Sequence, residues 1–479
     1  MSSNHPYPNR WRALGVIATA QFLVIMDTSI IGVALPDMQK SLGFSPSNLS
    51  WVFNAYVIAL AGLLLLGGKL SDVLGARRVF AAGFAILTAA SLAAGLARSV
   101  PAEIAARAAQ GVGAALIAPA ALTLLITCFS PEPRELGKAM ALYAAAAPAG
   151  GTAGVFLGGV LTQWLDWPWV FYVNVPIGLA VLFLTPRVLP SGHRAGGRID
   201  ALSAVTVTGA LSLLVLGVVR APELGWTDTT TMSSLAGGVA LLAAFVVMQA
   251  TRRDPLMPLG IFRTKDLAAG NAVMALLGAA WVPMWFFLNL FLQQVLGYGP
   301  FAAGASLLPM TVLMMILMVG VTGRTVGRFG NRRVLVTGLL SLSGGLAILT
   351  ALSPNSTFAE VALPGSLVAA LGMSLAYIPA MLSSMAHAAP SEAGLASGIV
   401  NTTYQIGSAL GLAAMTAVAT SAGANTVGDP VALTDGYSAA FAGAAAIAVV
   451  AAVVAAVFVA RRPDDVPSAE PVAQPTLVS

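Results

Sequence analysis

Two charged residues, Asp27 and Arg107, stand in stretches that are otherwise apolar. Asp27 lies within QFLVIMDTSIIGVALP (residues 21–36), and we place no other of the 19 acidic residues as deep inside an apolar segment. A carboxylate in the middle of a membrane helix costs about 3 kcal/mol or more, so it usually faces a polar cavity. Such a group can bind and release a proton as its surroundings alternate between wet and dry. A permanent hydrogen-bond network is the structural alternative.

Arg107 is the predicted partner of Asp27. Asp27 lies nine residues before Pro36, and Arg107 lies six residues after Pro101. With a rise of 1.5 Å per residue, both lie roughly 9–14 Å below the outer surface, where they can meet. Glu103, four residues before Arg107 on the same helical face, is the alternative partner.

Fourteen apolar segments must position these two residues. The chain is 57% hydrophobic and 9% charged, whereas a soluble domain has about 25% charged residues. Each segment reaches the roughly 20 residues that a spanning helix needs, so we expect an all-α integral membrane protein. The predicted spans are 12–35, 49–68, 79–97, 101–126, 138–162, 168–186, 200–219, 232–250, 267–294, 301–322, 334–352, 359–383, 393–420 and 438–460.

Basic residues predict the orientation of these spans. With a cytoplasmic N-terminus, the cytoplasmic segments hold 20 of the 24 Lys and Arg residues, the outer loops hold three, and Arg107 lies in a span. Positive residues gather on the cytoplasmic side, so both termini are expected in the cytoplasm. We expect a multi-pass protein of the cell (plasma or inner) membrane. The net charge of +5 reflects this bias and implies no nucleic-acid partner.

A repeated loop divides the chain. GGKLSDVLGARR (67–78) and TGRTVGRFGNRR (322–333) share two glycines and two arginines at an offset of 255 residues. The two copies lie eight spans apart, whereas two six-helix halves would place them six spans apart, so two extra spans lie in between. Parallel repeats of this kind are typical of major facilitator transporters. The predicted parts are an N-terminal six-helix bundle (1–186), a linker with two extra spans (187–266), a C-terminal six-helix bundle (267–462) and a disordered cytoplasmic tail (463–479).

The first copy of the loop is a candidate conformational latch. Its glycines let helix ends approach and turn, and its carboxylate can pair with an arginine or with a helix N-terminus. The simpler interpretation is that the positive residues only set the topology. The latch residues are Gly68, Asp72, Gly75, Arg77 and Arg78.

Polar and aromatic residues in the second, ninth and thirteenth spans could line a mostly apolar, drug-sized cavity. Helix packing is the alternative for each of them. The candidates are Asn54, Tyr56, Trp281, Trp285, Phe287, Asn289, Gln293, Gln294, Asn401, Tyr404 and Gln405. The sequence contains no metal-ligand cluster, phosphate-binding loop or hydrolytic triad, so we expect no enzymatic activity, cofactor or metal.

These motifs resemble the 14-span drug:proton antiporters of the major facilitator superfamily, the EmrB/QacA type. The resemblance covers nearly the whole chain. It rests on MDTSIIGVALP (26–36), the GGKLSDVLGARR loop, RAAQGVGAALIAPA (107–120), WPWVFYVNVPIG (167–178), LQQVLGYGPFAAGASLLP (292–309) and GLASGIVNTTYQIGSALG (394–411). It adds Gln110 to the candidate site residues.

The antiporter motif of the fifth span departs from the family pattern. GTAGVFLGG (151–159) has Val155 where the family usually has proline. Its glycines remain, namely Gly150, Gly154, Gly158 and Gly159. Pro168 and Tyr404 stand where arginine is common.

The resemblance implies a monomeric exporter of hydrophobic or cationic small molecules that takes up protons in exchange and works by alternating access in the lipid bilayer. An uptake symporter or uniporter shares the fold but usually has 12 spans. A non-transporting membrane sensor or membrane enzyme would need a signalling domain or a catalytic cluster, and the sequence contains neither.

Overall fold

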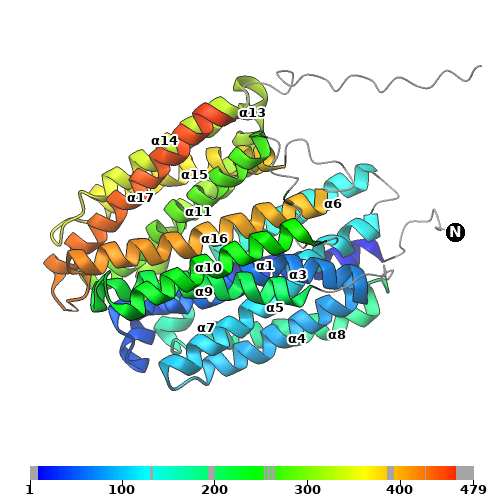
Figure 1. The fold of residues 1–479 in the computed structure, drawn as a ribbon, viewed down its shortest axis with the longest axis horizontal. Helices are drawn as coiled ribbons and strands as arrows, with labels where there is room; N and C mark the ends of the chain where they lie inside the picture. Colours follow the sequence, from blue (N-terminus) through cyan, green and yellow to red (C-terminus); the bar gives the residue numbers. More distant parts are fainter. Residues whose placement is uncertain are drawn as a thin grey trace, which may run out of the picture.

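The computed structural model describes residues 9–129, 133–191, 200–252, 255, 259, 265–385, 393–426 and 428–459, and these residues form helices and no strand. Within these residues, fourteen helices are long and apolar enough to cross a membrane, as the sequence predicts. They run roughly side by side along the long axis of the molecule (Figure 1). The predicted tail (463–479) and all three histidines lie outside the described residues.

The first half contains six long helices and two short ones. Their bounds are α1 Arg10–Leu42, α2 Pro46–Leu49, α3 Trp51–Leu70, α4 Ala76–Gly95, α5 Val100–Phe129, α6 Pro133–Trp164, α7 Trp169–Tyr172 and α8 Asn174–Val188, with a π-helical turn η1 at Ser71–Gly75.

The extra spans and the second half follow. Their bounds are α9 Ala201–Leu224, α10 Thr229–Thr251, α11 Lys265–Leu290, α12 Pro300–Leu317, α13 Gly323–Phe329, α14 Asn331–Leu349, α15 Leu363–Ser384, α16 Ala393–Ala419 and α17 Pro430–Phe458, with π-helical turns η3 Phe291–Val295, η4 Met318–Thr322, η5 Phe358–Ala362 and η7 Thr420–Ala424.

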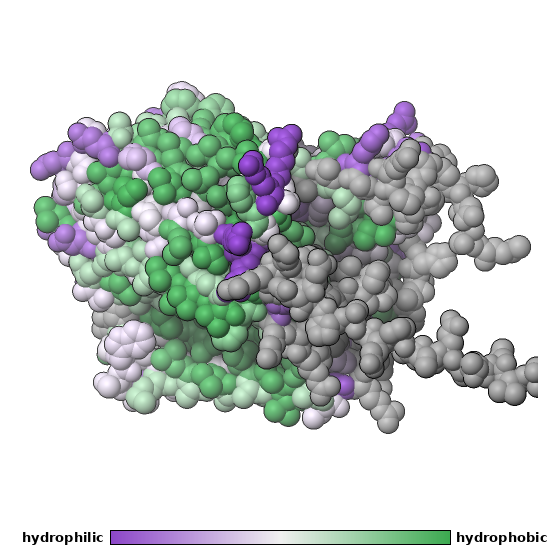
Figure 2. Space-filling model, turned by 90° about the horizontal axis from the view of Figure 1, so that it is seen from above, coloured by the Kyte–Doolittle hydropathy of each residue, from purple (hydrophilic) through white to green (hydrophobic). Residues whose placement is uncertain are grey.

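The outer surface of the bundle is apolar. Phe183 of α8 and Val457 of α17, for example, keep 61% and 62% of their surface exposed. Apolar side chains also cover most of the described surface on the flank seen in Figure 2. A water-soluble protein rarely exposes so large an apolar area, whereas lipid chains solvate it well.

The two halves use the same helix pairings. In the first half, α1 packs on α6, α3 and α4 pack on α5, and α4 packs on α8. The equivalent helices eight spans later pair in the same way: α11 packs on α16, α12 and α14 pack on α15, and α14 packs on α17. This correspondence supports the proposed division into two six-helix bundles.

Helices α9 and α10 form a hairpin outside both bundles. They pack on each other, and α9 also packs on α3 of the first half and α16 of the second. Arg252 Nη1 lies 2.5 Å from Asp200 Oδ1 and so joins the end of α10 to the start of α9. In Figure 1 the green hairpin lies between the blue-to-cyan and yellow-to-red helices. It therefore covers the line along which the two halves meet.

One glycine has the same backbone conformation in both repeated loops. Gly75 has φ 94° and ψ 127°, and Gly330 has φ 84° and ψ 153°. Side chains other than glycine's rarely tolerate positive φ, which explains why glycine occupies this place in both copies.

The first helix is longer than the sequence predicts. We expected the span to end near Pro36, but α1 continues to Leu42 and ends where Gly43 adopts a left-handed conformation with its N–H on Gln39 O. A proline is tolerated within a membrane helix because neighbouring helices pack around the freed carbonyl, and Pro36 is buried. Asp27 consequently lies near the middle of α1.

We predict that Gly75→Ala destabilises the protein, because positive φ costs a residue with a side chain about 1–2 kcal/mol. Gly68→Ala is the matched control, since Gly68 is helical and an added Cβ would meet only Pro119 at 3.8 Å. The midpoint of thermal unfolding in detergent should fall for Gly75→Ala and stay the same or rise for Gly68→Ala. Equal midpoints for the two variants would contradict the assignment.

Candidate functional site

Asp27 is fully buried and holds three hydrogen bonds. Its Oδ2 accepts a bond of 2.8 Å from Arg107 Nη1. Its Oδ1 accepts bonds from Asn174 Nδ2 at 2.6 Å and Gln110 Nε2 at 3.1 Å. Neither side chain of the ion pair has any exposed surface. Asp27 and Arg107 therefore meet as the sequence predicts, and their role in proton coupling stays a prediction.

Arg107 is held from several sides. Its Nε donates to Val52 O at 2.9 Å, and its Nη1 also donates to Gln110 Oε1 at 2.7 Å. The guanidinium lies over the Tyr56 ring at 4.6 Å and near the Phe171 ring at 5.9 Å. Aromatic faces attract a cation most strongly where water is excluded. This environment compensates in part for removing the guanidinium from water.

Six helices contribute to the group that we call the Asp27 cluster. The cluster consists of Asp27 on α1, Tyr56 on α3, Ser91 on α4, Arg107 and Gln110 on α5, Phe171 on α7 and Asn174 on α8. Gln110 connects Asp27 to Ser91 within this cluster, because the Gln110 Nε2 that donates to Asp27 also donates to Ser91 Oγ at 2.8 Å. A change in the protonation of Asp27 would thus alter hydrogen bonds from α5 and α8 and, through Gln110, the contact with α4.

A glycine brings α5 close enough to the cluster. Gly111, next to Gln110, lies against the backbone carbonyl of Tyr56, and a Cβ there would overlap this carbonyl. The close approach of α3 and α5 lets the guanidinium of Arg107 reach Val52 O and the Tyr56 ring. The sequence motif that places Arg107, Gln110 and Gly111 close together thus has a direct packing reason.

Glu103, the alternative partner of Arg107, is buried but uses neither oxygen. Its Oε1 and Oε2 have no hydrogen-bond partner among the described residues. The structure therefore favours Asp27 over Glu103 as the partner of Arg107. One guanidinium nitrogen, Arg107 Nη2, is likewise without a partner there.

The glycines of the fifth span face two different helices. Gly150, Gly154 and Gly158 lie against carbonyls of α1, and a Cβ on Gly154 would come within 2.8 Å of Met26 O. Gly159 instead faces Phe301 at the start of α12, which belongs to the other half. The motif thus packs α6 on the helix that carries Asp27 and also on the opposite half.

The loop residues of the candidate latch lie at the end of α3 and the start of α4. Arg77 Nη1 donates to Leu189 O at 3.2 Å and so binds the end of α8, while Arg78 is exposed. The glycine that allows the close helix contact at the end of α3 is Gly67, because it lies against Ala115 O. Gly68 makes no such close contact. The side chain of Asp72 lies outside the described part of the chain, so the latch stays a prediction.

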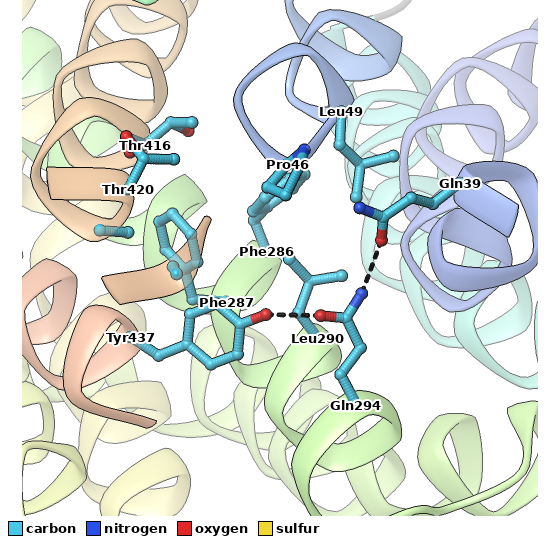
Figure 3. A pocket seen from close by; sticks show the side chains of 12 residues that line it. Gln39, Pro46, Leu49, Phe286, Phe287, Leu290, Gln294, Thr416, Thr420 and Tyr437 are labelled. Carbon is cyan, nitrogen blue, oxygen red and sulfur yellow. Dashed lines mark hydrogen bonds between the residues drawn. The ribbon is translucent and has the colours of Figure 1, made fainter. Parts of the chain in front are cut away.

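Several candidate cavity residues lie where the two halves meet, at the helix ends that the sequence predicts to face outward. Gln293 Nε2 donates to Val33 O at 2.9 Å and to Asn289 Oδ1 at 3.0 Å. Gln294 Nε2 donates to Gln39 Oε1 at 2.8 Å, and its Oε1 accepts a bond of 2.7 Å from Tyr437 OH (Figure 3). These glutamines therefore connect α1 to η3, and we call these contacts the outer seam.

The remaining candidates have other surroundings. Phe287 packs on the Tyr437 ring at 5.5 Å beside the outer seam. Tyr404 packs edge-on against Tyr377 at 5.8 Å. Asn54 is buried, and its amide has no partner among the described residues. Trp281 and Gln405 are half-buried, and Asn401 is exposed.

Trp285 also belongs to the outer seam. A Cβ on Gly32 would overlap its indole, so α1 and α11 approach closely here.

Sequence reasoning did not identify Asn174 and Ser91 as members of the Asp27 cluster. The sequence marks Asn174 only as part of the motif WPWVFYVNVPIG (167–178), and its place two residues before Pro176 is typical of a helix start. Its bond of 2.6 Å to Asp27 requires the packing of α8 beside α1. Only the requirement that a buried carboxylate has several donors could have prompted a search for it.

We predict that Arg107→Met is much more destabilising than the double change Asp27→Asn with Arg107→Met. The single change leaves an uncompensated buried charge, which costs about 3–5 kcal/mol, while the double change removes both charges. Thermal unfolding of the purified variants in detergent measures this difference. If the double variant were as unstable as the sum of both single variants, the two side chains would not act as a pair.

Comparison with known proteins assigns the chain to a family. The model of the Major Facilitator Superfamily matches residues 17–412 and 315–478. The cephamycin export protein CmcT of Amycolatopsis lactamdurans is 41% identical over 433 residues, which cover 90% of this chain and 88% of that protein. The puromycin resistance protein pur8 of Streptomyces alboniger is 37% identical over 439 residues, which cover 90% of this chain and 87% of that protein.

Solved structures share the fold. A peptide transporter POT in complex with sulfate has a TM-score of 0.69 at 15% identity and covers 94% of each chain. From the family match and the relatives, this chain belongs to the major facilitator superfamily.

Proposed function

We propose that this protein exports hydrophobic or cationic small molecules in exchange for protons, and that Asp27 carries the proton. The observation behind this proposal is the fully buried ion pair between Asp27 and Arg107, which joins α1 to α5. A buried pair contributes little to stability compared with an apolar packing of the same volume. Its presence in the middle of a membrane helix therefore favours a role in function.

The exchange of a proton gives the cluster two arrangements. With Asp27 ionised, Oδ2 accepts from Arg107 and Oδ1 from Asn174 and Gln110. A proton on Asp27 removes the charge that Arg107 pairs with, and one oxygen becomes a donor. The bonds between α1, α5 and α8 must then rearrange, which would couple protonation to helix position.

The outer seam supports a cycle of alternating access. Two hydrogen bonds from η3 reach Val33 and Gln39 on α1. They lie on the helix that carries Asp27, toward its outer end. We propose that these bonds hold the outer side closed in this structure and break when the outer side opens. The loop with Gly68, Asp72, Gly75, Arg77 and Arg78 would act in the same way at the opposite side.

The relatives indicate the class of substrate. The names of two of them state cephamycin export and puromycin resistance. Export of antibiotic-like molecules is therefore the direction and substrate class that we propose here. The mostly apolar residues around the outer seam and α16 suit such molecules, while one buried acid gives a cation only limited help.

We place the protein in the cell membrane as a monomer with both termini in the cytoplasm. The support for the orientation is the excess of Lys and Arg in the segments on that side.

We predict that Asp27→Asn abolishes uphill export, because asparagine keeps the size and can still hydrogen-bond but cannot titrate. The measurement is puromycin efflux from sealed vesicles with an imposed pH gradient, with and without a protonophore. Glu103→Gln is the matched control, since it also neutralises a buried carboxyl close to Arg107 in sequence, but one without a partner in the described structure.

The control variant should keep at least half of the wild-type export. Undiminished uphill efflux by Asp27→Asn would exclude this residue as the essential proton carrier. Wild-type efflux that the protonophore leaves unchanged would contradict proton coupling itself.

A further inference from the structure

A cavity lies under the α9–α10 hairpin, away from the Asp27 cluster and from the outer seam. Its volume is about 290 Å³, close to the lower end of the range for small-molecule sites. Its walls come from five helices: α3 of the first half, α9 and α10 of the hairpin, and α11 and α16 of the second half. A molecule in this cavity would contact all three parts of the protein.

The cavity walls are apolar apart from three side chains. Leu65, Val207 and Phe245 are typical of its lining, and none of the described lining residues is charged. The polar exceptions are Asn271, Thr402 and Thr403. An ionised ligand would lose its hydration here without gaining a counter-charge, so the cavity selects uncharged molecules.

The side-chain amide of Asn271, a residue of the cavity wall, has a fixed orientation. Its Nδ2 donates to Leu267 O at 2.9 Å and is 3.4 Å from Ser384 O. Turning the amide over would bring its oxygen against these carbonyl oxygens, so the Oδ1 position is determined by the packing. That Oδ1 has no partner in the described structure, although the residue is only 3% exposed.

Thr402 of α16 contributes a second polar atom without a hydrogen-bond partner in the described structure. Its Oγ1 also lacks a partner among the described residues, and the residue is 7% exposed. Thr403, by contrast, donates to Ile399 O at 2.8 Å and is satisfied within its own helix. Buried polar atoms normally have partners, so two unpartnered ones on residues that line a single apolar cavity point to a ligand with its own polar group.

We propose that this cavity, which we call the hairpin site, binds an uncharged and mostly apolar molecule that carries a hydrogen-bond donor such as a hydroxyl. The donor bonds to Asn271 Oδ1, and its oxygen can accept from Thr402 Oγ1. The site is not sealed, because Ala272 is exposed and Val246 keeps 43% of its surface exposed. Asn271 lies six residues after the start of α11, roughly 9 Å along the helix.

The hairpin itself is built to close this site. A Cβ on Gly62 of α3 would overlap Thr208 of α9, so glycine is needed for α9 to pack here. Because α3 and α16 belong to different halves, a molecule held between them and the hairpin would bind the alternating states of the transporter unequally. Such unequal binding is the condition for a ligand to shift a conformational equilibrium.

Photolabelling of the purified full-length protein in phosphatidylcholine nanodiscs tests the hairpin site. The probes are a diazirine-bearing decanol and its methyl ether, which has the same chain but no donor. We expect the alcohol to label peptides of α10 and α11 that line the cavity, and unlabelled decanol to compete. The ether should label them about three- to tenfold less, as expected for the loss of one hydrogen bond.

Three test variants and one control variant complete the test. Thr402→Val and Asn271→Leu should reduce the preference for the alcohol over the ether, with Thr402→Val as the variant that breaks no bond of the described structure. Ala272→Phe should fill the cavity and prevent labelling, while Val247→Phe, on an exposed face of α10, should leave it unchanged. Each variant is compared only after it elutes as wild type on size exclusion.

Three results would overturn the proposal. Equal labelling by alcohol and ether would show that the cavity accepts any apolar chain, including the acyl chain of a lipid. Labelling that Ala272→Phe leaves unchanged, or that spreads evenly over the exposed faces of the helices, would show that no such site exists. Neither readout depends on transport, so a failure of the proposed export function would leave this test intact.

Discussion

The buried ion pair between Asp27 and Arg107 is the interaction on which the arrangement of the first half depends. Moving two charges out of water costs several kcal/mol for each ion, and their attraction repays this only when further hydrogen bonds satisfy them. Here Asn174 and Gln110 donate hydrogen bonds to the carboxylate. Val52 O accepts a hydrogen bond from the guanidinium, which also lies over the Tyr56 ring. The helices α1, α3, α5 and α8 must therefore keep one relative position while the pair is charged. A proton on Asp27 relaxes that requirement.

Among the described residues of the second half, the helices that correspond to α1 and α5 carry no equivalent of this pair. The helix α11, which corresponds to α1, carries Asp266 at its first turn and no other acidic residue, and α15, which corresponds to α5, carries no charged residue. The two halves thus share helix pairings but differ in chemistry. The second half supplies the glutamines of the outer seam and two walls of the hairpin site. A rearrangement that starts at Asp27 would reach the second half through α1. Val33 and Gln39 of this helix accept hydrogen bonds from glutamines of the second half.

The sequence predicts those features that depend on one helix or on simple physical cost. Fourteen spans follow from apolar length, and the Asp27–Arg107 contact follows from two charges in apolar surroundings. The predicted end of the first span was wrong, because we took Pro36 as a boundary. Packing around this proline allows α1 to continue to Leu42. Asn174 as a donor to Asp27 and the hairpin site could not be predicted. The first needs the packing of α8 beside α1, and the second needs five helices that come from three parts of the chain.

We propose that Asp27 exchanges its proton against the exported molecule. Infrared difference spectroscopy of the reconstituted protein tests it most directly, because a protonated carboxyl has a C=O stretching band that a carboxylate lacks. At a pH where wild-type protein shows this band and the Asp27→Asn variant does not, addition of an exported drug should remove it, as the drug and the proton alternate. A band that persists unchanged at saturating drug, or that is equally strong in Asp27→Asn, would contradict the claim.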